Sequence, residues 1–519
     1  MAQPRVTTDD GSAPPPGLVE AVLARESARI AGDTKALTGF IERGPLTLRV
    51  DTAGLVEGPD AIATQLAALR ESGASLAQEL RIHRAGPGVS HVVSTHLAAS
   101  GARATVSQLW RQGDDGRWRV AAAHVSTPGP AVDQRVWRLV GSPLFEGASE
   151  GPLRGETVAV KDLFAVTGVR RGVGVRAYAA EAKPEFETAP AVRALLDAGA
   201  DVVGIAQTDQ FAYSLAGTNP DYGTPPNPAV PGAIPGGSSS GPATAVALGQ
   251  ASIGLGTDTA GSVRVPASYQ GLWGIRPTHG AIPLQGVVPL APSFDTVGYL
   301  ARNGETLLAA ASVGLTGAPF VRPGQRVLVP DAVVTPYDDV QRAFREASAA
   351  CAPNAERVEL PALSDLTEAY RVTQQAEAWR AHGSWVAAHP GVLAPDVAAR
   401  FFAASSVTPG REAEGIALRE RLAAQLDEVL GDAVLIVPAA ASAAPLLSAP
   451  DSDLEAARTA TLGLTSIAGI TGRPALSVPL MWVPGGPVGL SLVGPRGSDL
   501  ALIRTAIAWV RNIGTIRIA

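Results

Sequence analysis

The sequence predicts an α/β fold in which a large sheet is covered by helices, preceded by a smaller α+β module. Strand-like apolar runs alternate with helix-like segments from about residue 151 to the C-terminus, which is typical of helices packed on a sheet. A stretch rich in proline and glycine separates that region from a different pattern before it, as expected of a domain boundary. We therefore predict a disordered tail (1–16), the α+β module (17–127), a connector (128–150) and the main domain (151–519).

The composition is that of an ordinary soluble globular protein. The 519 residues are enough for several domains, and 46% are hydrophobic while 17% are charged, which excludes a disordered chain. A formal net charge of −6 argues against nucleic acid or an anionic membrane as the main partner. No apolar run approaches the length of a membrane span, and the first residues lack the apolar core of a signal peptide. We expect a cytoplasmic protein.

Cysteine and histidine usage bears on disulfides and metals. Cys351 is the only cysteine, so an intrachain disulfide or a cysteine-based metal site is excluded. The seven histidines show no HExxH or HxxxH spacing, so the sequence offers no support for a metal site. We expect neither a metal nor a cofactor.

The first 127 residues predict a tail followed by helices and a curved antiparallel sheet. Residues 1–16 carry Thr, Asp, Ser, Gly and three consecutive prolines, a composition typical of a disordered tail. Apolar residues then recur at helical spacing, and alternating segments follow. The elements expected are helices at 17–30 and 59–72 and strands at 46–50, 88–97, 103–111 and 117–125.

The end of this module carries a family resemblance. The segment QLWRQGDDGRWRVAAAHVS reads as a last hairpin whose Asp114-Asp115-Gly116 turn supplies positive dihedrals. It resembles the NTF2-like (SnoaL-type) cone and, in its details, the AtzH-like branch of that superfamily. Trp110 and His124 either line the mouth of the cone or are packing residues. The superfamily includes pockets, dimer interfaces and enzymes, so the role of the module stays open; pairing through the open face of its sheet predicts a homodimer.

The main domain begins with an apolar strand that ends on a lysine. The run at 153–161 finishes with Lys161 and Asp162, and a helix at 189–199 and a strand at 201–206 follow. Residues 338–430 are mostly helical by pattern. The later elements expected are strands at 434–438, 474–479 and 488–493 and a closing helix at 499–510.

A Gly/Ser-rich stretch at 232–266 is the centre of the functional argument. It holds Ser238, Ser239 and Ser240 between glycines, then an Ala-rich segment, then Ser262. A flexible linker is one interpretation, but residues 243–251 carry helix-forming spacing after Pro242.

A literal G-x-S-x-G centred on Ser239 suggests an α/β-hydrolase elbow. That elbow must follow a strand directly, whereas the approach here is NPAVPGAIPG. It also needs a histidine, and His279, His382 and His389 lie in no telling context.

A better match uses three separated segments in order. VAVKD ends on Lys161-Asp162, GGSSSG holds Ser238, and GLGTDTAGSVRVPASYQGLWGIRPT holds Ser262. Together with YGTPPNP and PALSVP, they resemble the amidase signature family over residues 150–510. The resemblance implies a large mixed, mostly parallel sheet covered by helices. Ser240 and Pro242 stand where glycine and often serine are usual, and Gln210 replaces a common glutamate.

The resemblance also implies a mechanism. Ser262 would be the nucleophile, Ser238 after a cis Gly237–Ser238 bond would relay its proton, and Lys161 would be the base. A lysine can act so only if burial or nearby positive charge lowers its pKa. The remaining implied residues are an oxyanion hole of backbone N–H groups (Thr259, Ala260, Gly261, Ser262) and the supporting residues Ser239, Asp258 and Arg264.

Each of these residues has a structural alternative. Lys161 alone would be a surface lysine and Ser238 a turn serine, while Asp258 and Arg264 would form an internal pair that braces the loop. Three arginines after Lys161 either clamp a substrate carboxylate or belong to a solvated loop (Arg170, Arg171, Arg176).

The leading hypothesis is an amidase that cleaves a small C–N amide through an acyl-enzyme. One alternative is a transamidase subunit that hands ammonia to a partner, and another is a ligand-binding protein with an inert amidase half. The AtzH-like resemblance and the arginines favour a ureido or carboxylate-bearing amide, such as carboxybiuret or allophanate.

Overall fold

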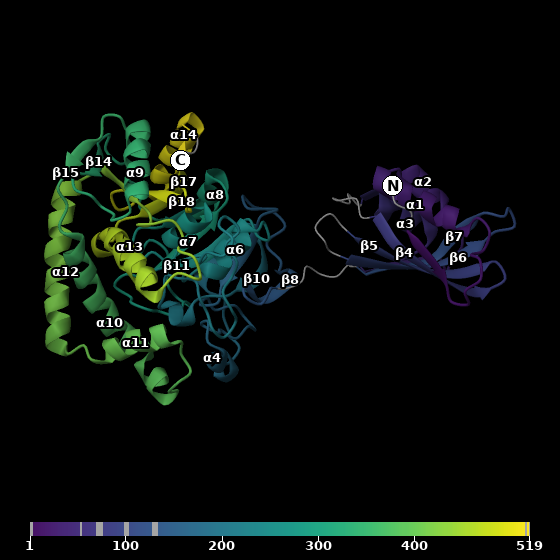
Figure 1. Cartoon of the computed structure of the whole chain (residues 1–519), viewed down its shortest axis with the longest axis horizontal. Helices are drawn as coiled ribbons and strands as arrows, with labels where there is room; N and C mark the ends of the chain where they lie inside the picture. Colours follow the sequence, from purple (N-terminus) through teal and green to yellow (C-terminus); the bar gives the residue numbers. More distant parts are fainter. Residues whose placement is uncertain are drawn as a thin grey trace. The chain divides into compact units, whose positions relative to one another are not determined.

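The computed structural model describes residues 4–51, 54–68, 76–97, 103–126, 133–513 and 516–517. The chain divides into two compact units, Met1–Val132 and Asp133–Ala519 (Figure 1). The boundary therefore falls inside the predicted connector, and the second unit begins well before residue 151.

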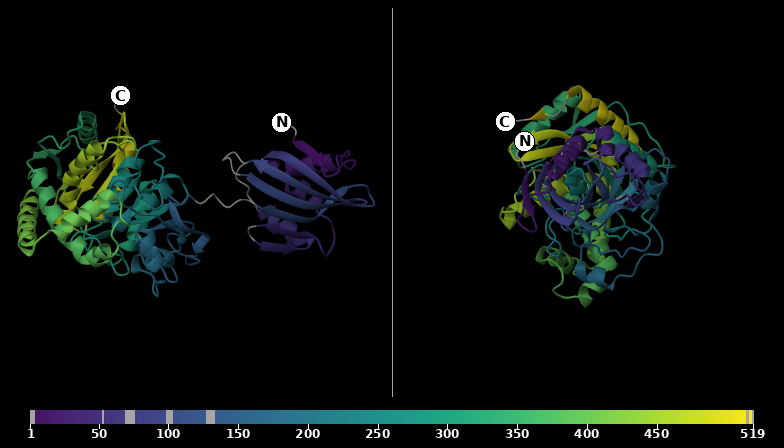
Figure 2. Two further views of the ribbon diagram at one scale, coloured as in Figure 1. Left: turned by 60° about the horizontal axis from the view of Figure 1, so that its bottom comes forward. Right: turned by 90° about the vertical axis from the view of Figure 1, so that its right-hand side faces the viewer.

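The first unit is a curved sheet with helices against one face (Figures 1 and 2). Leu18 and Val22 of the first helix pack on Leu80, Ile82 and Trp110 of the sheet, so the apolar face of the helix is buried. The sheet order is β1 (Arg5–Thr8), β4 (Leu76–Gly86), β5 (Val89–Leu97), β6 (Arg103–Gln112), β7 (Trp118–Ser126), β2 (Leu48–Asp51), β3 (Gly54–Glu57). The helices are α1 (Leu18–Ala31), α2 (Thr34–Gly39) and α3 (Pro59–Ala68).

The predictions for the first unit have different outcomes. The predicted tail contains β1, which pairs in parallel with β4; its backbone hydrogen bonds offset a composition that favours disorder. The end of the predicted helix at 59–72 lies outside the described residues. The predicted hairpin turn is confirmed at Gly116, whose φ is +73°. Membership of the NTF2-like superfamily stays a prediction.

Trp110 and His124 have different surroundings. Trp110 is fully buried, donates its indole N–H to Gln108 Oε1 at 3.0 Å and meets Phe40 edge-on. It is therefore a packing residue. His124 is exposed.

The second unit is built on one large mixed sheet. The prediction of a mostly parallel sheet is wrong, because every neighbouring pair from β16 through β18, β17, β12 and β13 to β11 is antiparallel. Parallel pairs lie on either side of that block, in β15–β14–β16 and β11–β9–β10. The sheet order is β15 (Glu356–Val358), β14 (Val327–Pro330), β16 (Val434–Pro438), β18 (Gly486–Val493), β17 (Ala475–Val483), β12 (Trp273–Arg276), β13 (Thr296–Ala301), β11 (Ile253–Asp258), β9 (Thr157–Lys161), β10 (Asp201–Ala206), β8 (Trp137–Phe145), with β19 (Ile516–Arg517) beside β17.

Strand β8 lies where a connector was predicted. It pairs antiparallel with β10 at the edge of the sheet. Trp137, its first residue, is 5% exposed and packs with Ala159 and Ala206. An edge strand tolerates Pro143 and exposed residues because one side makes no ladder, and for this reason the segment does not look like a buried strand in the sequence.

Helices cover the sheet, as predicted for the region after residue 151. Helices α10, α11 and α12 form the mostly helical region and pack together (Figure 1). The helices are α4 (Arg176–Glu181), α5 (Pro190–Asp197), α6 (Ser240–Ala247), α7 (Arg264–Gln270), α8 (Gly304–Gly314), α9 (Asp338–Cys351), α10 (Leu363–Ala388), α11 (Pro395–Ser405), α12 (Pro409–Leu430), α13 (Asp451–Thr471) and α14 (Asp499–Ile513).

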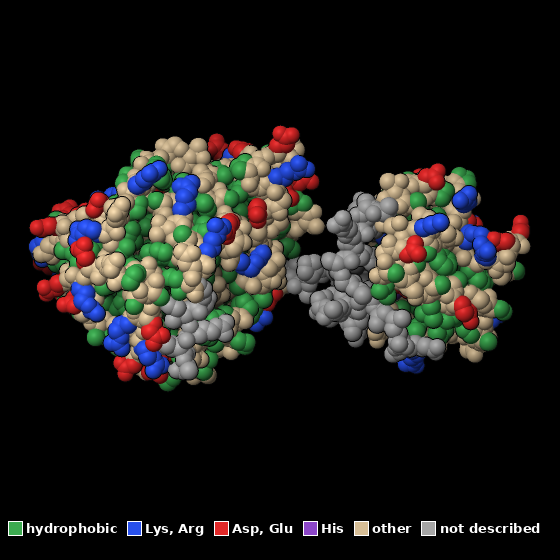
Figure 3. Space-filling view, turned by 90° about the horizontal axis from the view of Figure 1, so that it is seen from above, with side chains coloured by type: hydrophobic (Ala, Val, Ile, Leu, Met, Phe, Trp, Pro, Cys, Tyr) green, Lys and Arg blue, Asp and Glu red, His purple; other side chains and the backbone are tan. Residues whose placement is uncertain are grey.

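The surface of this unit carries charges of both signs. On the face shown in Figure 3, basic and acidic side chains are interspersed over the second unit. No helix among the described residues is long and apolar enough to cross a bilayer.

Candidate active site

Strand β9 carries Lys161 into the buried interior of the second unit. The strand lies between β10 and β11, and Val158, Ala159 and Val160 are fully buried within it. The lysine is its last residue and is itself 0% exposed. Lys161 of the VAVKD segment is therefore a buried lysine, not a surface lysine.

Three hydroxyl groups surround the lysine amine. Nζ lies 2.8 Å from Ser238 Oγ, 3.0 Å from Ser239 Oγ and 2.9 Å from Thr257 Oγ1. Burial disfavours the ammonium form and lowers the pKa of Lys161 to about 7, although nearby carboxylates oppose this shift. Burial therefore favours the neutral amine, which can accept a proton.

The turn that carries Ser238 and Ser239 meets the turn that carries Ser262. The backbone N–H of Ser239 donates to the carbonyl of Ser262 at 3.2 Å, and Thr208 Oγ1 donates to the carbonyl of Ser238 at 2.8 Å. The Gly237–Ser238 bond is cis, as predicted. Ser262 is 2% exposed, and none of the described residues hydrogen-bonds its hydroxyl.

Ser238 and Ser239 are not equivalent partners of the lysine. The Ser239 hydroxyl donates to the carbonyl of Thr257 at 3.2 Å. A hydroxyl has a single proton, so Ser239 can only accept from Lys161. Ser238 makes no such donation to the described residues, so its proton can move to the amine. The geometry thus favours Ser238 over Ser239 for proton transfer.

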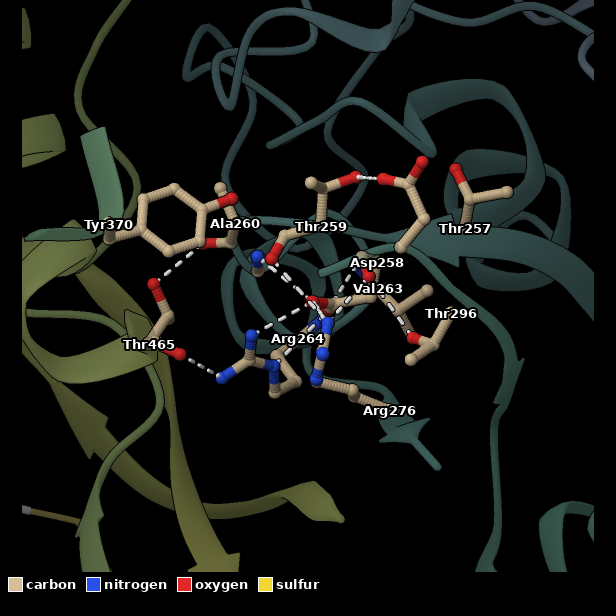
Figure 4. Close-up of polar contacts among 12 residues, drawn as sticks. Thr257, Asp258, Thr259, Ala260, Val263, Arg264, Arg276, Thr296, Tyr370 and Thr465 are labelled. Atoms are coloured by element: carbon tan, nitrogen blue, oxygen red, sulfur yellow. Dashed lines mark hydrogen bonds and ion pairs between the residues drawn. The ribbon is translucent and has the colours of Figure 1, made fainter. Parts of the chain in front are cut away.

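Asp258 organises the turn that carries Ser262. Its carboxylate accepts from Arg264 Nε at 3.0 Å and Nη2 at 2.8 Å, and from Arg276 Nη1 at 3.2 Å (Figure 4). It also accepts from the backbone N–H of Val263 at 3.1 Å. Arg264 and Arg276 hold the pKa of Asp258 well below its usual range despite burial. The predicted bracing pair is confirmed, with Arg276 as a third member.

The same turn is held from outside by other elements. Thr465 of α13 donates Oγ1 to the carbonyl of Ala260 at 2.6 Å and accepts from Arg264 Nη1 at its carbonyl (Figure 4). Thr259 Oγ1 donates to Asp295 Oδ1 at 2.6 Å. Sequence reasoning missed Thr465 and Asp295, which lie outside the Ser262 segment. It also missed Arg276, which stands in that segment, because the sequence does not show that it reaches Asp258.

The turn changes the predicted set of oxyanion donors. The N–H of Gly261 donates to Asp258 Oδ1 at 3.0 Å, so it is already in use and that part of the prediction is wrong. The described residues provide no acceptor for the N–H groups of Thr259, Ala260 and Ser262. Gly261 has a φ of +120°. This dihedral shapes the turn, and it favours glycine.

The histidines of the G-x-S-x-G interpretation lie elsewhere. His382 Nε2 lies 2.6 Å from the carbonyl of Pro289, and His389 contacts Glu181 and the carbonyl of Trp385. The backbone of His279 bonds Gly472. None of the three contacts Ser239, so the structure gives that serine no histidine base.

Two of the three arginines after Lys161 have partners within the protein, and the third is exposed. Arg171 pairs with Glu185 at 2.6 Å, and Arg176 lies over the Tyr222 ring and bonds the carbonyl of Asp221. Arg170 is exposed and its carbonyl accepts from Arg138. They do not come together as a clamp.

Two cavities adjoin the site. One of about 250 Å³ reaches Thr257, Thr259 and Asp295 and is otherwise lined by apolar residues such as Leu163 and Leu290. A second, of about 590 Å³, is lined by Val265 and Tyr269 of α7 and by residues of α11 and α13, including Arg400 and Arg458. The described residues contain no group of three side chains suited to a metal.

Comparison with known proteins decides the family. The chain is 33% identical to Amidase 1 of Arabidopsis thaliana, over 71% of this chain and 96% of that protein. The chain belongs to the amidase signature family. The family model described as Amidase matches residues 142–317 of this amidase, which include Lys161, Ser238 and Ser262. Solved structures of similar fold include an amidase (29% identity, TM-score 0.65, covering 73% of this chain and 92% of that one) and Kluyveromyces lactis allophanate hydrolase carrying S177A (28%, TM-score 0.64, 69% and 62%).

Three residues of this amidase differ from the usual family pattern: Ser240, Gln210 and Pro242. The structure shows what each one does locally. The Ser240 hydroxyl donates to Asp209 Oδ1 at 3.1 Å. The Gln210 amide oxygen accepts from the backbone N–H of Ala394 at 2.7 Å, which ties this segment to the start of α11. Pro242 lies in the first turn of α6, where a proline costs no helical hydrogen bond.

Proposed function

We propose that this amidase hydrolyses a small amide through an acyl-enzyme on Ser262, with Ser238 as proton relay and Lys161 as the base. The observation that carries the proposal is the buried lysine amine, 2.8 Å from Ser238 Oγ, with a pKa lowered to about 7 by burial. A base of that pKa is matched to chemistry near neutral pH.

Ser238 passes its proton to Lys161 and takes the proton of Ser262, whose oxygen bonds to the amide carbon. The N–H groups of Thr259, Ala260 and Ser262 would stabilise the negative oxygen that forms. The C–N bond then breaks, and the leaving nitrogen takes a proton back through Ser238. A water molecule then attacks the acyl-enzyme with the same proton transfers, the bond to Ser262 breaks, and the carboxylic acid is released.

We further propose a ureido or carboxylate-bearing substrate, of which allophanate and carboxybiuret are examples. The similarity to an allophanate hydrolase supports this class. Arg170, Arg171 and Arg176 do not, since the structure does not assemble them. The candidate cations are instead Arg400 and Arg458 in the wall of the 590 Å³ cavity. They now pair with Asp396 and Glu455.

Ammonia release from a panel of small amides tests the function. We expect the wild type to act on at least one ureido or carboxylate-bearing amide, and Ser262→Ala to lose all release. Ser312→Ala is the matched control, because among the described residues the Ser312 hydroxyl bonds the carbonyl of Leu308 in its own helix. Release that survives Ser262→Ala would refute the assignment.

The same panel separates the alternatives. A transamidase subunit would release ammonia from glutamine at a useful rate only with a partner, and a binding protein would bind amides without releasing any. We also propose that the first unit is an NTF2-like module, on the basis of its helices and curved sheet.

A further inference from the structure

Asp209 lies behind the turn that presents Ser238, at a position the sequence did not single out. It follows β10 and is fully buried. Its carboxylate accepts from the N–H of Gly217 at 2.9 Å and from the Ser240 hydroxyl at 3.1 Å. Its own N–H donates to the carbonyl of Ser238 at 3.4 Å. A Cβ on Gly237 would lie 2.2 Å from Asp209 Oδ2, so the carboxylate is packed against the Gly237–Ser238 peptide.

Asp209 differs from the other buried carboxylates near the site in the groups that surround its charge, because an arginine acts on each of the others. Asp258 has Arg264 and Arg276, and Asp162 has Arg138 at 2.8 Å. Asp295 is stabilised by the Thr259 hydroxyl and two backbone N–H groups, and Arg276 also acts on it.

Asp209 receives hydrogen bonds from neutral groups of the described chain, namely Gly217, Ser240 and Ser214, and Lys161 is the cation that acts on it. Among the carboxylates that favour the protonated lysine, Asp209 has the largest effect, ahead of Asp258 and Asp295. The lysine and this carboxylate are therefore electrostatic partners across the Ser238 turn.

We propose that Asp209 is a positioning residue of the site: its carboxylate fixes the turn that presents Ser238 to Lys161, and its negative charge opposes loss of the lysine's proton. The inference rests on the proposed function of Lys161. It explains how a lysine in a fully buried site keeps enough proton affinity to take the proton that Ser238 passes on. Without the carboxylate, burial would lower the pKa of the amine further and make it a weaker base for the serine proton.

The test is the pH dependence of Ser262 acylation by a fluorophosphonate probe and of ammonia release from the best amide of the panel. Asp209→Asn removes the charge at nearly constant shape. Because the carboxylate raises the pKa of Lys161, its loss should move the rising limb of both profiles to lower pH. Asp209→Glu keeps the charge in a poorer position, so the limb should stay in place while kcat falls.

Two control variants separate charge from structure. Asp162→Asn removes a buried carboxylate next in the chain to Lys161 that faces Arg138, and Ser240→Gly removes a hydrogen bond to Asp209 without a charge. Both should leave the limb where it is in the wild type. If Asp209→Asn does not fold, Asp209→Ser is the neutral replacement with the same expected shift.

A rising limb that does not move in a folded neutral variant would overturn the role of Asp209. That outcome leaves the proposed function standing. A wild type that shows no acylation of Ser262 at any pH would instead refute the proposed function itself.

Discussion

Asp258→Asn should remove much of the stability of the second unit. Asp258 is 0% exposed, and its partners Arg276 and Arg264 are 0% and 2% exposed. The variant leaves two buried guanidinium groups without a carboxylate. Breaking a buried ion pair by removing one partner costs about 3–5 kcal/mol, a large share of the roughly 5–15 kcal/mol that stabilises a folded domain. We expect a loss in this range, together with loss of Ser262 acylation.

Urea unfolding of the variant and wild type, followed by circular dichroism, measures this loss. The matched control is Glu356→Gln, which removes one partner of the Arg326–Glu356 pair, whose side chains are 51% and 52% exposed. An exposed pair contributes at most about 1 kcal/mol. A loss below about 1 kcal/mol for Asp258→Asn would refute the claim that Asp258 holds the turn electrostatically.

The effect of Asp258 also has a defined pH window. The folded-state pKa of Asp258 is lowered by the arginines, so its contribution is fully present above the unfolded-state pKa of about 3.9. It is lost as the pH falls towards the folded-state value. The difference between wild type and variant should therefore be constant from pH 6 to 8 (~2 units above that unfolded value) and shrink in acid.

Three further predictions concern the turn, the boundary and the assembly. Gly261→Ala places a side chain at φ +120° with its Cβ 3.0 Å from Thr465 Cγ2 and should cost about 1–3 kcal/mol and abolish acylation; Gly410→Ala, in open space on α12, should do neither. A chain of residues 133–519 should melt and be acylated like the wild type. A chain of residues 151–519 lacks β8 and exposes the edge of β10, so it should melt at a lower temperature or aggregate. Equal melting temperatures of the two chains would contradict the place of β8. Light scattering should give a homodimer, twice the 53.0 kDa of the chain, and a monomer at micromolar concentration would count against it.

Elements buried on both faces could be read from the sequence. Strands β10 and β16 have the predicted bounds, 201–206 and 434–438, because a continuous apolar run between turn residues has few other interpretations. Strands at an edge or rich in glycine could not. β1, β8 and β11 lack such a run, and pairing with a distant strand is what makes them strands. The direction of pairing is also set by long-range contacts, so the antiparallel block at the centre of the sheet was missed.

The site shows the same division. Lys161, Ser238 and Ser262 stand in recognisable segments, and the structure brings the lysine to the Ser238 hydroxyl and the Ser262 turn to Ser239. Asp209 and Asp295 stand in no recognised segment, and Arg276 stands in the Ser262 segment without any sign that it reaches Asp258. A single charged residue in a sequence is most often exposed. The role of the Gly261 N–H was mispredicted because the sequence does not show that Asp258 folds back onto its own turn.

Mass spectrometry of the protein trapped with a fluorophosphonate or a slow amide tests the central claim most directly. We predict label on Ser262 in the wild type, retained in His279→Ala, His382→Ala and His389→Ala and lost in Ser262→Ala. Lys161→Ala should be severely impaired, and Ser238→Ala should slow both labelling by the amide and release of the acyl group. Label on Ser239, or labelling lost on removal of a single histidine, would contradict the account and restore the G-x-S-x-G interpretation.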